Sequence, residues 1–239
     1  MARRNVEGEA RPVGAEAGTV AAGFPEEEFP YVGDNSRNCR IAVERPEAGR
    51  PALLHLVKRG EGEFVLSGQE RGAGATRDAP PHMYSTDDCD ARLLLPVNTT
   101  HLKVEPYEGE PCSWAMRVLP LGDAAVFTGE HVGESSDVLY RFDAEPGLFE
   151  IEVERAEDHQ NWEVSFVCDH QLGGPLYVDS LCWECKAITD REAERIGTRL
   201  ADYVEATGED GGRFFLPGSG VITFVSEDNC RWSLRTARL

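Results

Sequence analysis

Two stretches of the chain, DARLLLPVNTTHLKVEPYEGEPCSWAMRV (residues 90–118) and GGRFFLPGSGVITFVSEDNCRWSLRT (residues 211–236), carry the same succession of residues. Each begins with an apolar run that ends at a proline, continues with alternating apolar and polar residues, and reaches a cysteine two residues before a tryptophan. The corresponding pairs are Pro96 and Pro217, Cys112 and Cys230, Trp114 and Trp232, and Arg117 and Arg235. The correspondence predicts that one structural unit occurs twice.

Short segments of alternating polarity precede both stretches. In residues 148–154, Phe149, Ile151 and Val153 alternate with glutamates, which is the period of a half-buried antiparallel strand. The expected strands are 39–44, 52–58, 63–67, 91–96, 101–105 and 113–118 in the first half, and 137–142, 148–155, 161–168, 213–217, 221–225 and 231–236 in the second. Gly, Pro, Asn and Asp separate these segments, as is typical of a sandwich or barrel.

The two halves differ between their third and fourth expected strands. In the first half, two glycines and two prolines within residues 72–81 predict that residues 68–90 form a loop. In the second half, residues 169–212 contain a helix pattern that Thr189 can cap and Gly208 can stop. This helix is expected to begin at about Asp190.

These patterns predict a mainly β fold of two tandem antiparallel β-sandwich or barrel-like domains, related by an internal repeat, with one helix inserted in the second. The first domain is expected at residues 29–121 and the second at 122–239, with the helical insertion at 169–212. Residues 1–28 are rich in Gly, Ala and Glu and are expected to form a flexible N-terminal arm. The tryptophans expected in the structural core are Trp114, Trp162 and Trp232.

A family resemblance points to the same fold. The stretches that carry it are Glu63-Phe64 and Asn161-Trp162, Leu95-Pro96 and Leu216-Pro217, and Trp114 and Trp232. They resemble a tandem β-sandwich repeat of uncharacterised actinobacterial proteins, whose halves pair an aromatic strand with a later Leu-Pro segment and a terminal tryptophan. The resemblance covers residues 30–239 and implies a fold but no established activity.

Composition excludes several classes of partner. The 239 residues contain 43 Asp and Glu against 24 Lys and Arg, a formal net charge of −19. Such a charge repels phosphate backbones, so nucleic acid is not expected as a partner. No apolar run is long enough for a membrane helix, and the N-terminus does not read as a secretion signal, so we expect a cytoplasmic protein. The seven cysteines are then expected to be mostly reduced thiols.

The sharpest local feature is CDHQLGGPLYVDSLCWECKA (residues 168–187). Cys168, His170, Cys182 and Cys185 offer three thiolates and an imidazole, the donors that structural zinc takes in a tetrahedral site. A disulfide and inert thiols are the alternatives. A redox-active pair of cysteines usually lies at a helix N-terminus, and the expected helix begins past Cys185, which argues against that function.

Calcium binding and hydrolysis are two further possibilities, and the sequence supports each of them weakly. The acidic loops at residues 33–38 and 85–90 offer oxygens for calcium from Asp34, Asn35, Asp87, Asp88 and Asp90, although these residues are also common turn formers. For hydrolysis, no Gly-x-Ser-x-Gly motif occurs and the six histidines are scattered. A hydrolase site would have to be assembled in space.

We therefore expect a non-catalytic binding or scaffold module whose partner is another protein. The contacts are expected at the insertion of the second domain or at the cleft between the domains. Tyr177, Trp183 and Arg195 are the candidate partner-binding residues, since aromatic residues and arginine dominate binding hot spots. No cofactor is expected unless the metal-binding alternative holds, with zinc or calcium bound, and a spatially assembled hydrolase is the other alternative.

Overall fold

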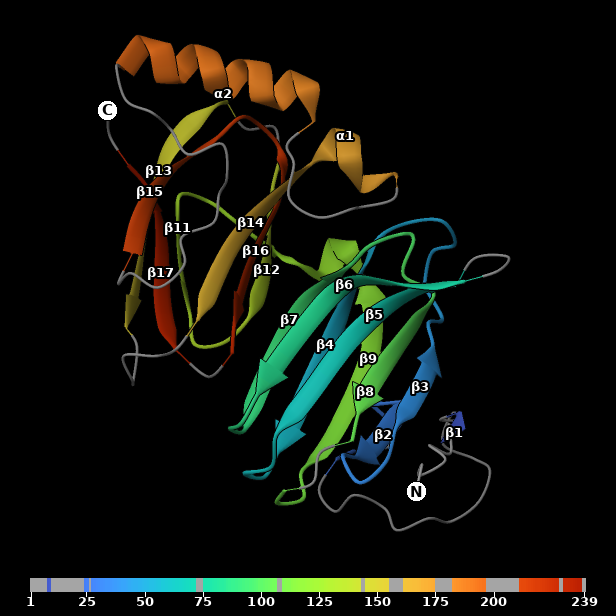
Figure 1. Ribbon diagram of the computed structural model, residues 1–239. Helices are drawn as coiled ribbons and strands as arrows, with labels where there is room; N and C mark the ends of the chain where they lie inside the picture. Colours follow the sequence, from blue (N-terminus) through green and yellow to red (C-terminus); the bar gives the residue numbers. More distant parts are fainter. Residues whose placement is uncertain are drawn as a thin grey trace.

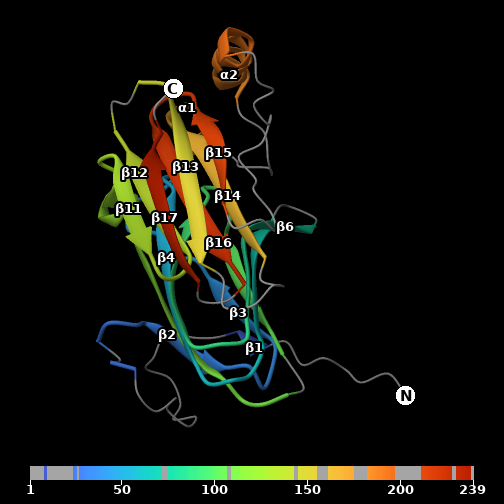
Figure 2. The same ribbon diagram turned by 90° about the vertical axis from the view of Figure 1, so that its left-hand side faces the viewer.

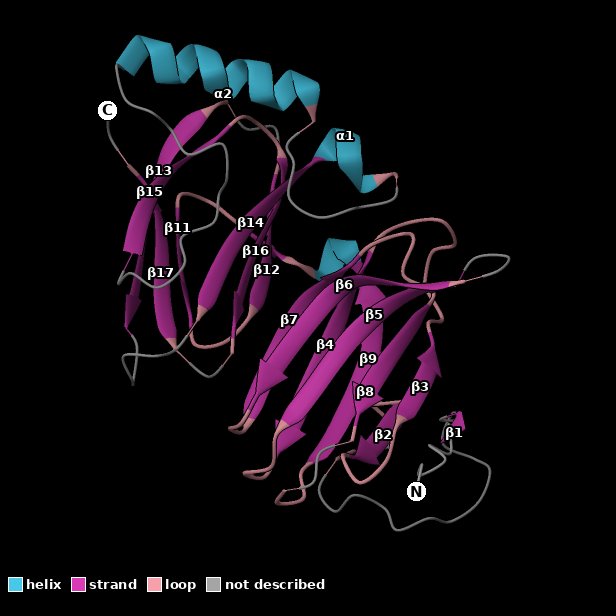
Figure 3. Ribbon diagram, viewed as in Figure 1, coloured by secondary structure: helices cyan, strands magenta, loops and turns pink. Residues whose placement is uncertain are grey.

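The computed structural model describes residues 8–9, 24–25, 27–71, 75–106, 109–142, 145–154, 161–174, 182–196, 211–227 and 230–237. The chain is mainly β and forms two lobes, each built from two sheets (Figures 1 and 3). The elements of the first half are β1 (Gly8–Glu9), β2 (Tyr31–Asp34), β3 (Cys39–Ala42), β4 (Ala52–Arg59), β5 (Phe64–Arg71), β6 (Thr76–Ser85), β7 (Cys89–Leu95), β8 (His101–Glu105), β9 (Ser113–Pro120) and the short 3₁₀ helix η1 (Leu121–Asp123). Those of the second half are β10 (Ala125–Val126), β11 (Glu130–Gly133), β12 (Asp137–Arg141), β13 (Gly147–Glu154), β14 (Trp162–Cys168), α1 (Asp169–Leu172), α2 (Trp183–Ile196), β15 (Gly211–Leu216), β16 (Gly220–Ser226) and β17 (Arg231–Thr236).

The first half is a sandwich of two sheets. One sheet has the strand order β1-β3-β8-β5-β6 and the other β2-β9-β4-β7. Alternate residues of these strands point inward and form one apolar cluster that contains Ile41, Leu54, Leu66, Val104 and Trp114. The core therefore lies between the two sheets, as the alternation of the sequence predicts.

The second half is a sandwich with sheets β10-β12-β16-β14 and β11-β17-β13-β15. Its core cluster draws on both sheets and contains Phe149, Ile151, Trp162 and Trp232. Figure 2 shows the two sandwiches stacked along the length of the molecule, with α2 beyond the end of the second one. The mainly β, sandwich-like fold is confirmed, and all three tryptophans expected in the core are at most 2 % exposed.

The strand orders of the two halves correspond in both sheets. In one sheet, β3-β8-β5 of the first half corresponds to β12-β16-β14 of the second. In the other sheet, β2-β9-β4-β7 corresponds to β11-β17-β13-β15. Trp114 lies opposite Gly33 in the paired strand and donates its indole N–H to the carbonyl of Asp34 at 3.1 Å. Trp232 lies opposite Gly133 and donates to the carbonyl of Ser135 at 2.9 Å. That one unit was duplicated, with domains at residues 29–121 and 122–239, remains an interpretation of this similarity.

The two sandwiches contact each other through apolar residues on the outer faces of their sheets. Leu53 and Leu94 of the first half share a cluster with Val138 and Val221 of the second. Ala124, in the short connection between β9 and β10, is buried in the same cluster. The backbone N–H of Arg92 also donates to the Ser136 carbonyl at 2.9 Å. These contacts fix the position of one sandwich on the other.

The expectation of a loop over residues 68–90 is wrong. Strand β5 continues to Arg71, and β6 covers residues 76–85, including the cis peptide between Pro80 and Pro81. β6 tolerates the two prolines because it is the edge strand of its sheet, where a missing N–H need not break a ladder hydrogen bond. A register shift between Ser67 and Gly68 accommodates the irregular stretch.

Lys58 is a fully buried cation at the end of β4. Its ammonium donates to three backbone carbonyls, those of Gly60 at 2.7 Å, Asp87 at 2.8 Å and Thr86. The carbonyls belong to the β4–β5 and β6–β7 turns, so the lysine ties two loops at one end of the first sandwich. A buried ammonium is tolerated only when such acceptors replace its water.

Lys58→Met is expected to lower the free energy of unfolding by about 2–3 kcal/mol, because three buried carbonyls lose their donor together. Urea denaturation measures the loss. Lys103→Met is the control, since this partly exposed lysine pairs with a surface glutamate at 2.8 Å, and the variant should lose less than about 1 kcal/mol. Equal losses in the two variants would contradict a structural role of Lys58.

The two Trp–Gly contacts give a direct comparison of the halves. A Cβ added at Gly33 would lie 2.4 Å from the Trp114 ring, and one at Gly133 would lie 2.5 Å from the Trp232 ring. Gly33→Ala and Gly133→Ala should therefore each destabilise the protein by about 1–3 kcal/mol through overpacking. Gly122→Ala is the control, since nothing lies within 4 Å of its added Cβ. Thermal or urea unfolding in which all three variants behave alike would refute overpacking at the tryptophans, and a loss in only one of Gly33→Ala and Gly133→Ala would refute the equivalence of the two sites.

Candidate metal centre

The first two residues of the centre follow from the end of β14. Residues Trp162, Val164, Phe166 and Cys168 alternate with more exposed ones, so Cys168 points into the core of the second sandwich. The chain turns directly into the short helix α1, whose second residue, His170, is exposed. The buried thiol and the exposed imidazole thus come from the same turn at the end of one strand.

The other two residues lie at the start of α2, and here the expected helix start is wrong. The helix begins at Trp183 rather than near Asp190, and Thr189 lies inside it, donating its hydroxyl to the Cys185 carbonyl at 3.0 Å. The Cys182 sulfur accepts the Cys185 backbone N–H at 3.5 Å, which is the role of a cap side chain. The expected stop at Gly208 lies outside the described residues.

The four donor atoms of Cys168, His170, Cys182 and Cys185 all lie within 4.8 Å of one another. The sulfurs of Cys168 and Cys182 are 3.4 Å apart, and the Cys182 sulfur is 3.8 Å from Nδ1 of His170. Ligands of a tetrahedral zinc ion with Zn–S bonds of about 2.3 Å stand roughly 3.8 Å apart. The group can therefore hold a metal ion, as the sequence predicted, and it is the one such group of His, Cys, Asp and Glu found in the described part of the chain.

The pKa values of the three thiols are shifted in different directions by their surroundings. Burial raises the pKa of the Cys168 and Cys185 thiols, and the Cys182 sulfur raises the pKa of both further. Burial acts in the same direction on Cys182, but the Cys185 backbone N–H, His170 and the adjacent thiols stabilise its thiolate and lower its pKa to about 7. Cys182 is therefore the thiol that ionises first, and a cation at the centre would favour the ionised form of all three.

The position of Cys182 removes one argument made from the sequence. The expected late helix start counted against a redox-active cysteine pair, yet Cys182 directly precedes α2, where a helix N-terminus favours thiolate. The seven cysteines, all within the described ranges, form no disulfide. A third thiol and an imidazole converge on the same point, which suits a metal ion better than a two-cysteine redox centre.

The candidate partner-binding residues are placed only in part. Tyr177 lies outside the described residues. Trp183 and Arg195 belong to α2, at its first and next-to-last positions, but their side chains are not among those described. Their role in binding remains a prediction.

The acidic loops gain no support as calcium sites. The carboxylate of Asp34 accepts the backbone N–H of Ser36 at 3.0 Å, and the side-chain oxygen of Asn35 accepts the N–H of Cys112 at 3.0 Å. A carboxylate oxygen of Asp88 accepts the N–H of Gly60 at 2.6 Å. These oxygens stabilise turns, as Asp and Asn commonly do.

The hydrolase alternative meets an obstacle at His55, the one buried histidine in the described part of the chain. Nε2 of His55 lies 2.7 Å from the carboxylate of Asp90, and Nδ1 accepts a hydrogen bond from the Arg117 guanidinium at 3.0 Å. The Phe29 ring lies against both His55 and Arg117. Because both ring nitrogens are engaged, His55 has none left to take a proton from a nucleophile.

Comparison of this chain with known proteins does not indicate a function. No family model matches the sequence, and no curated protein matches it. A chain from a structure of the triple jelly-roll fold and turret assembly in an archaeal virus aligns with 87 % of this chain at 9 % identity and a TM-score of 0.23, and 56 % of that chain is covered. A similarity at this level supports no conclusion about fold or activity. Within the described residues, no helix is long and apolar enough to cross a membrane.

The pKa differences predict an order of alkylation in chelator-treated protein. Cys182 should react first with iodoacetamide, and its rate should rise as pH increases through about 7, because the thiolate is the nucleophile. Cys168 and Cys185 should lag, since burial keeps them protonated. Peptide mass mapping over time measures the order, and Cys182→Ser should remove the fast phase. Simultaneous labelling of all three would contradict the arrangement.

Proposed function

We propose that the protein binds one Zn²⁺ through Cys168, His170, Cys182 and Cys185, and that this structural zinc fixes the helical insertion to the second sandwich. The observation that carries the proposal is the convergence of four donor atoms within 4.8 Å from two separate segments. Three thiolates and an imidazole favour zinc over the hard cations calcium and magnesium, which prefer oxygen.

The donor set supports a structural rather than a catalytic role. Four protein ligands fill a tetrahedral shell, so no position is left for water or substrate. Two of the ligands, Cys168 and Cys185, are buried and belong to the core of the second sandwich. Such a metal stabilises a fold and does not activate water.

The zinc would act as a clamp across the insertion. Cys168 and His170 lie at the end of β14, and Cys182 and Cys185 lie at the start of α2. Among the described residues, Cys185 of α2 belongs to the apolar cluster of the second sandwich, and Cys182, just before the helix, packs against it. A metal at this point therefore determines where the helix begins and how it leaves the sandwich.

A clamped helix fits the expected binding or scaffold module. Figure 1 shows α2 lying past the ends of the strands of the second sandwich. In this proposal the zinc fixes where α2 begins and so presents the helix to another protein. Metal binding and partner binding are then linked through the position of one helix.

Zinc content and thermal stability test the proposal. Protein purified without added metal should contain one zinc per chain, and chelation should lower the melting temperature of the second sandwich by roughly 10 °C, because a tightly bound ion stabilises only the folded state. Elemental analysis and calorimetry with and without chelator measure the two effects. Refolding with Zn²⁺ should restore the melting temperature, while Ca²⁺ should not.

A matched pair of substitutions separates the centre from ordinary core packing. Cys185→Ser should lose the zinc, while Cys230→Ser should retain it, since both cysteines are buried in the same core cluster and only the first is a ligand. Zinc retained by both variants, or absent from the unmodified protein, would rule out the site. A disulfide among the three cysteines of freshly purified protein would do so as well.

A further inference from the structure

The four residues of the candidate metal centre differ in their access to solvent. Cys168 and Cys185 are 1 % and 4 % exposed and belong to the core cluster of the second sandwich. His170 is exposed, and Cys182, just before α2, is partly exposed. The centre is therefore closed on the side of the core and open on the other side, where Cys182 supplies its accessible sulfur.

An accessible metal-bound sulfur is a target for small oxidants in solution. A bound zinc ion keeps its cysteine ligands deprotonated, and the deprotonated sulfur is the form that a hydroperoxide oxidises. Of the seven cysteines, all within the described ranges, Cys39 and Cys182 are partly exposed and the other five are buried. Cys182 is thus the cysteine that combines access to solvent with a place in the metal centre.

A second sulfur lies next to that of Cys182. Sγ of Cys168 is 3.4 Å from Sγ of Cys182, although the two residues are 14 positions apart in the sequence. A neighbouring thiolate displaces hydroxide from an oxidised cysteine and forms a disulfide, in which the sulfurs are about 2.05 Å apart. The two sulfurs therefore need to approach each other by little more than about 1 Å. Cys168 is placed to complete an oxidation that begins at Cys182.

We propose that a hydroperoxide oxidises the zinc centre at Cys182, that Cys168 then forms a disulfide with it, and that the zinc ion is released. The inference rests on the zinc site proposed above and adds a reaction to it. The disulfide joins the same two segments that the zinc holds together, the end of β14 and the residue before α2. Oxidation therefore exchanges a metal link for a covalent one at the base of the insertion.

With hydrogen peroxide, the reaction balances in two steps. In the first, the Cys182 thiolate attacks one peroxide oxygen, an S–O bond forms, the O–O bond breaks and hydroxide leaves, so that the sulfur becomes a sulfenic acid. In the second, the Cys168 thiolate attacks that sulfur, the S–S bond forms, the S–O bond breaks and a second hydroxide leaves. The two thiolates give two electrons to the peroxide, and both hydroxides take up protons from solvent and become water. The metal remains Zn²⁺ and leaves because two of its four ligands have become a neutral disulfide.

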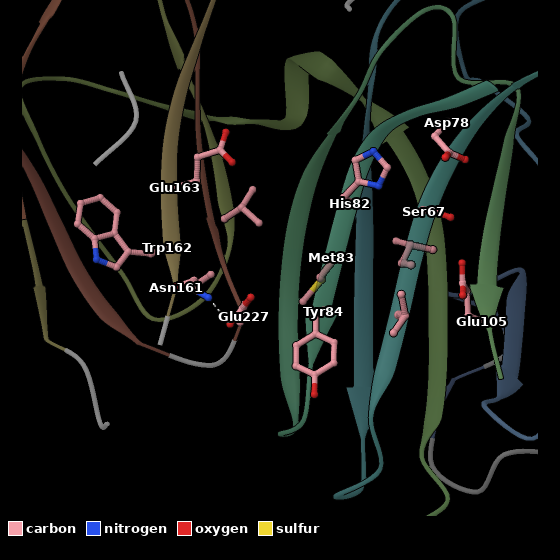
Figure 4. A pocket seen from close by; sticks show the side chains of 14 residues that line it. Ser67, Asp78, His82, Met83, Tyr84, Glu105, Asn161, Trp162, Glu163 and Glu227 are labelled. Atoms are coloured by element: carbon pink, nitrogen blue, oxygen red, sulfur yellow. Dashed lines mark hydrogen bonds between the residues drawn. The ribbon is translucent and has the colours of Figure 1, made fainter. Parts of the chain in front are cut away.

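Met83 is a competing sulfur for peroxide. It lines a cleft of about 490 Å³ between the two sandwiches, together with Trp162 and Glu163 of the opposite wall (Figure 4). No cysteine is among the residues of the described chain that line this cleft. Oxidation of Met83 adds one oxygen to a thioether and changes no ligand of the metal centre, so it predicts no release of zinc. Oxidation in the cleft and oxidation at the metal centre can therefore be measured separately.

Zinc release from the full chain tests the proposal. The protein is purified under reductant, separated from it, checked for zinc content and treated with hydrogen peroxide, while a chromogenic chelator records the released metal. One zinc should appear for each disulfide formed. Chymotrypsin, which cleaves after Tyr177 and Trp183, should then yield a peptide with Cys168 linked to Cys182. Dithiothreitol with Zn²⁺ should restore the metal-bound form, because thiol exchange reduces the disulfide.

Three variants locate the reactive sulfur. Cys182→His keeps four metal donors but removes the accessible sulfur, so it should retain zinc and release it at least about tenfold more slowly under peroxide. Cys39→Ser removes the other partly exposed cysteine, and Met83→Leu removes the thioether of the cleft. Both of these controls should release zinc at the rate of the unmodified protein.

Several outcomes would overturn the inference while leaving the zinc site intact. These are retention of zinc under peroxide, release without a disulfide, a disulfide between Cys182 and Cys185, and release at an unchanged rate from Cys182→His. If Cys182→His is isolated without metal, the disulfide mapped in the unmodified protein decides the question. Unmodified protein that contains no zinc before peroxide is added would instead overturn the zinc site itself, and the inference with it.

Discussion

The fold depends on the packing of two indole rings, each against a glycine of the neighbouring strand. Trp114 and Trp232 fill the interior where their two sheets meet, and the absence of a side chain at Gly33 and Gly133 lets the rings approach the paired backbone. Each indole N–H finds a carbonyl just after that glycine, so a large polar-tipped ring is buried without an unsatisfied donor. The alternating apolar residues on the surrounding strands complete two cores around these rings.

Much of this architecture could be predicted from the sequence because period-2 alternation is a direct imprint of half-buried strands. Residues 148–154 show it most clearly, and their strand, β13, is found at Gly147–Glu154. Strand β6 was not predicted because it contains two prolines. Proline destabilises a central strand but is tolerated in an edge strand, and the local sequence does not reveal which strands lie at an edge. The contact between sandwiches had a signal in the continuous apolar run at residues 93–95, where a strand buried on both faces loses its alternation.

The group of cysteines and histidine that can hold a metal ion was predictable from the sequence, but its structural setting was not. Cysteine and histidine at close spacing identify the donors, because few other functions require that combination. The start of α2 was missed because Thr189 with Glu192 imitates a capping box, whereas the true first turn is capped by a cysteine sulfur. The cleft between the sandwiches could not be predicted, because its lining residues, such as Met83 and Trp162, come from different halves and only the packing of one sandwich on the other brings the two walls together.

The apolar cluster between the sandwiches has a consequence for either half on its own. Leu53 and Leu94 of the first half pack against Val138 and Val221 of the second, and Ala124 in the connecting segment is buried with them. A first sandwich produced alone would expose these leucines to water and would be prone to self-association. Because both halves belong to one chain, the covering surface is always present, and the joint does not depend on protein concentration.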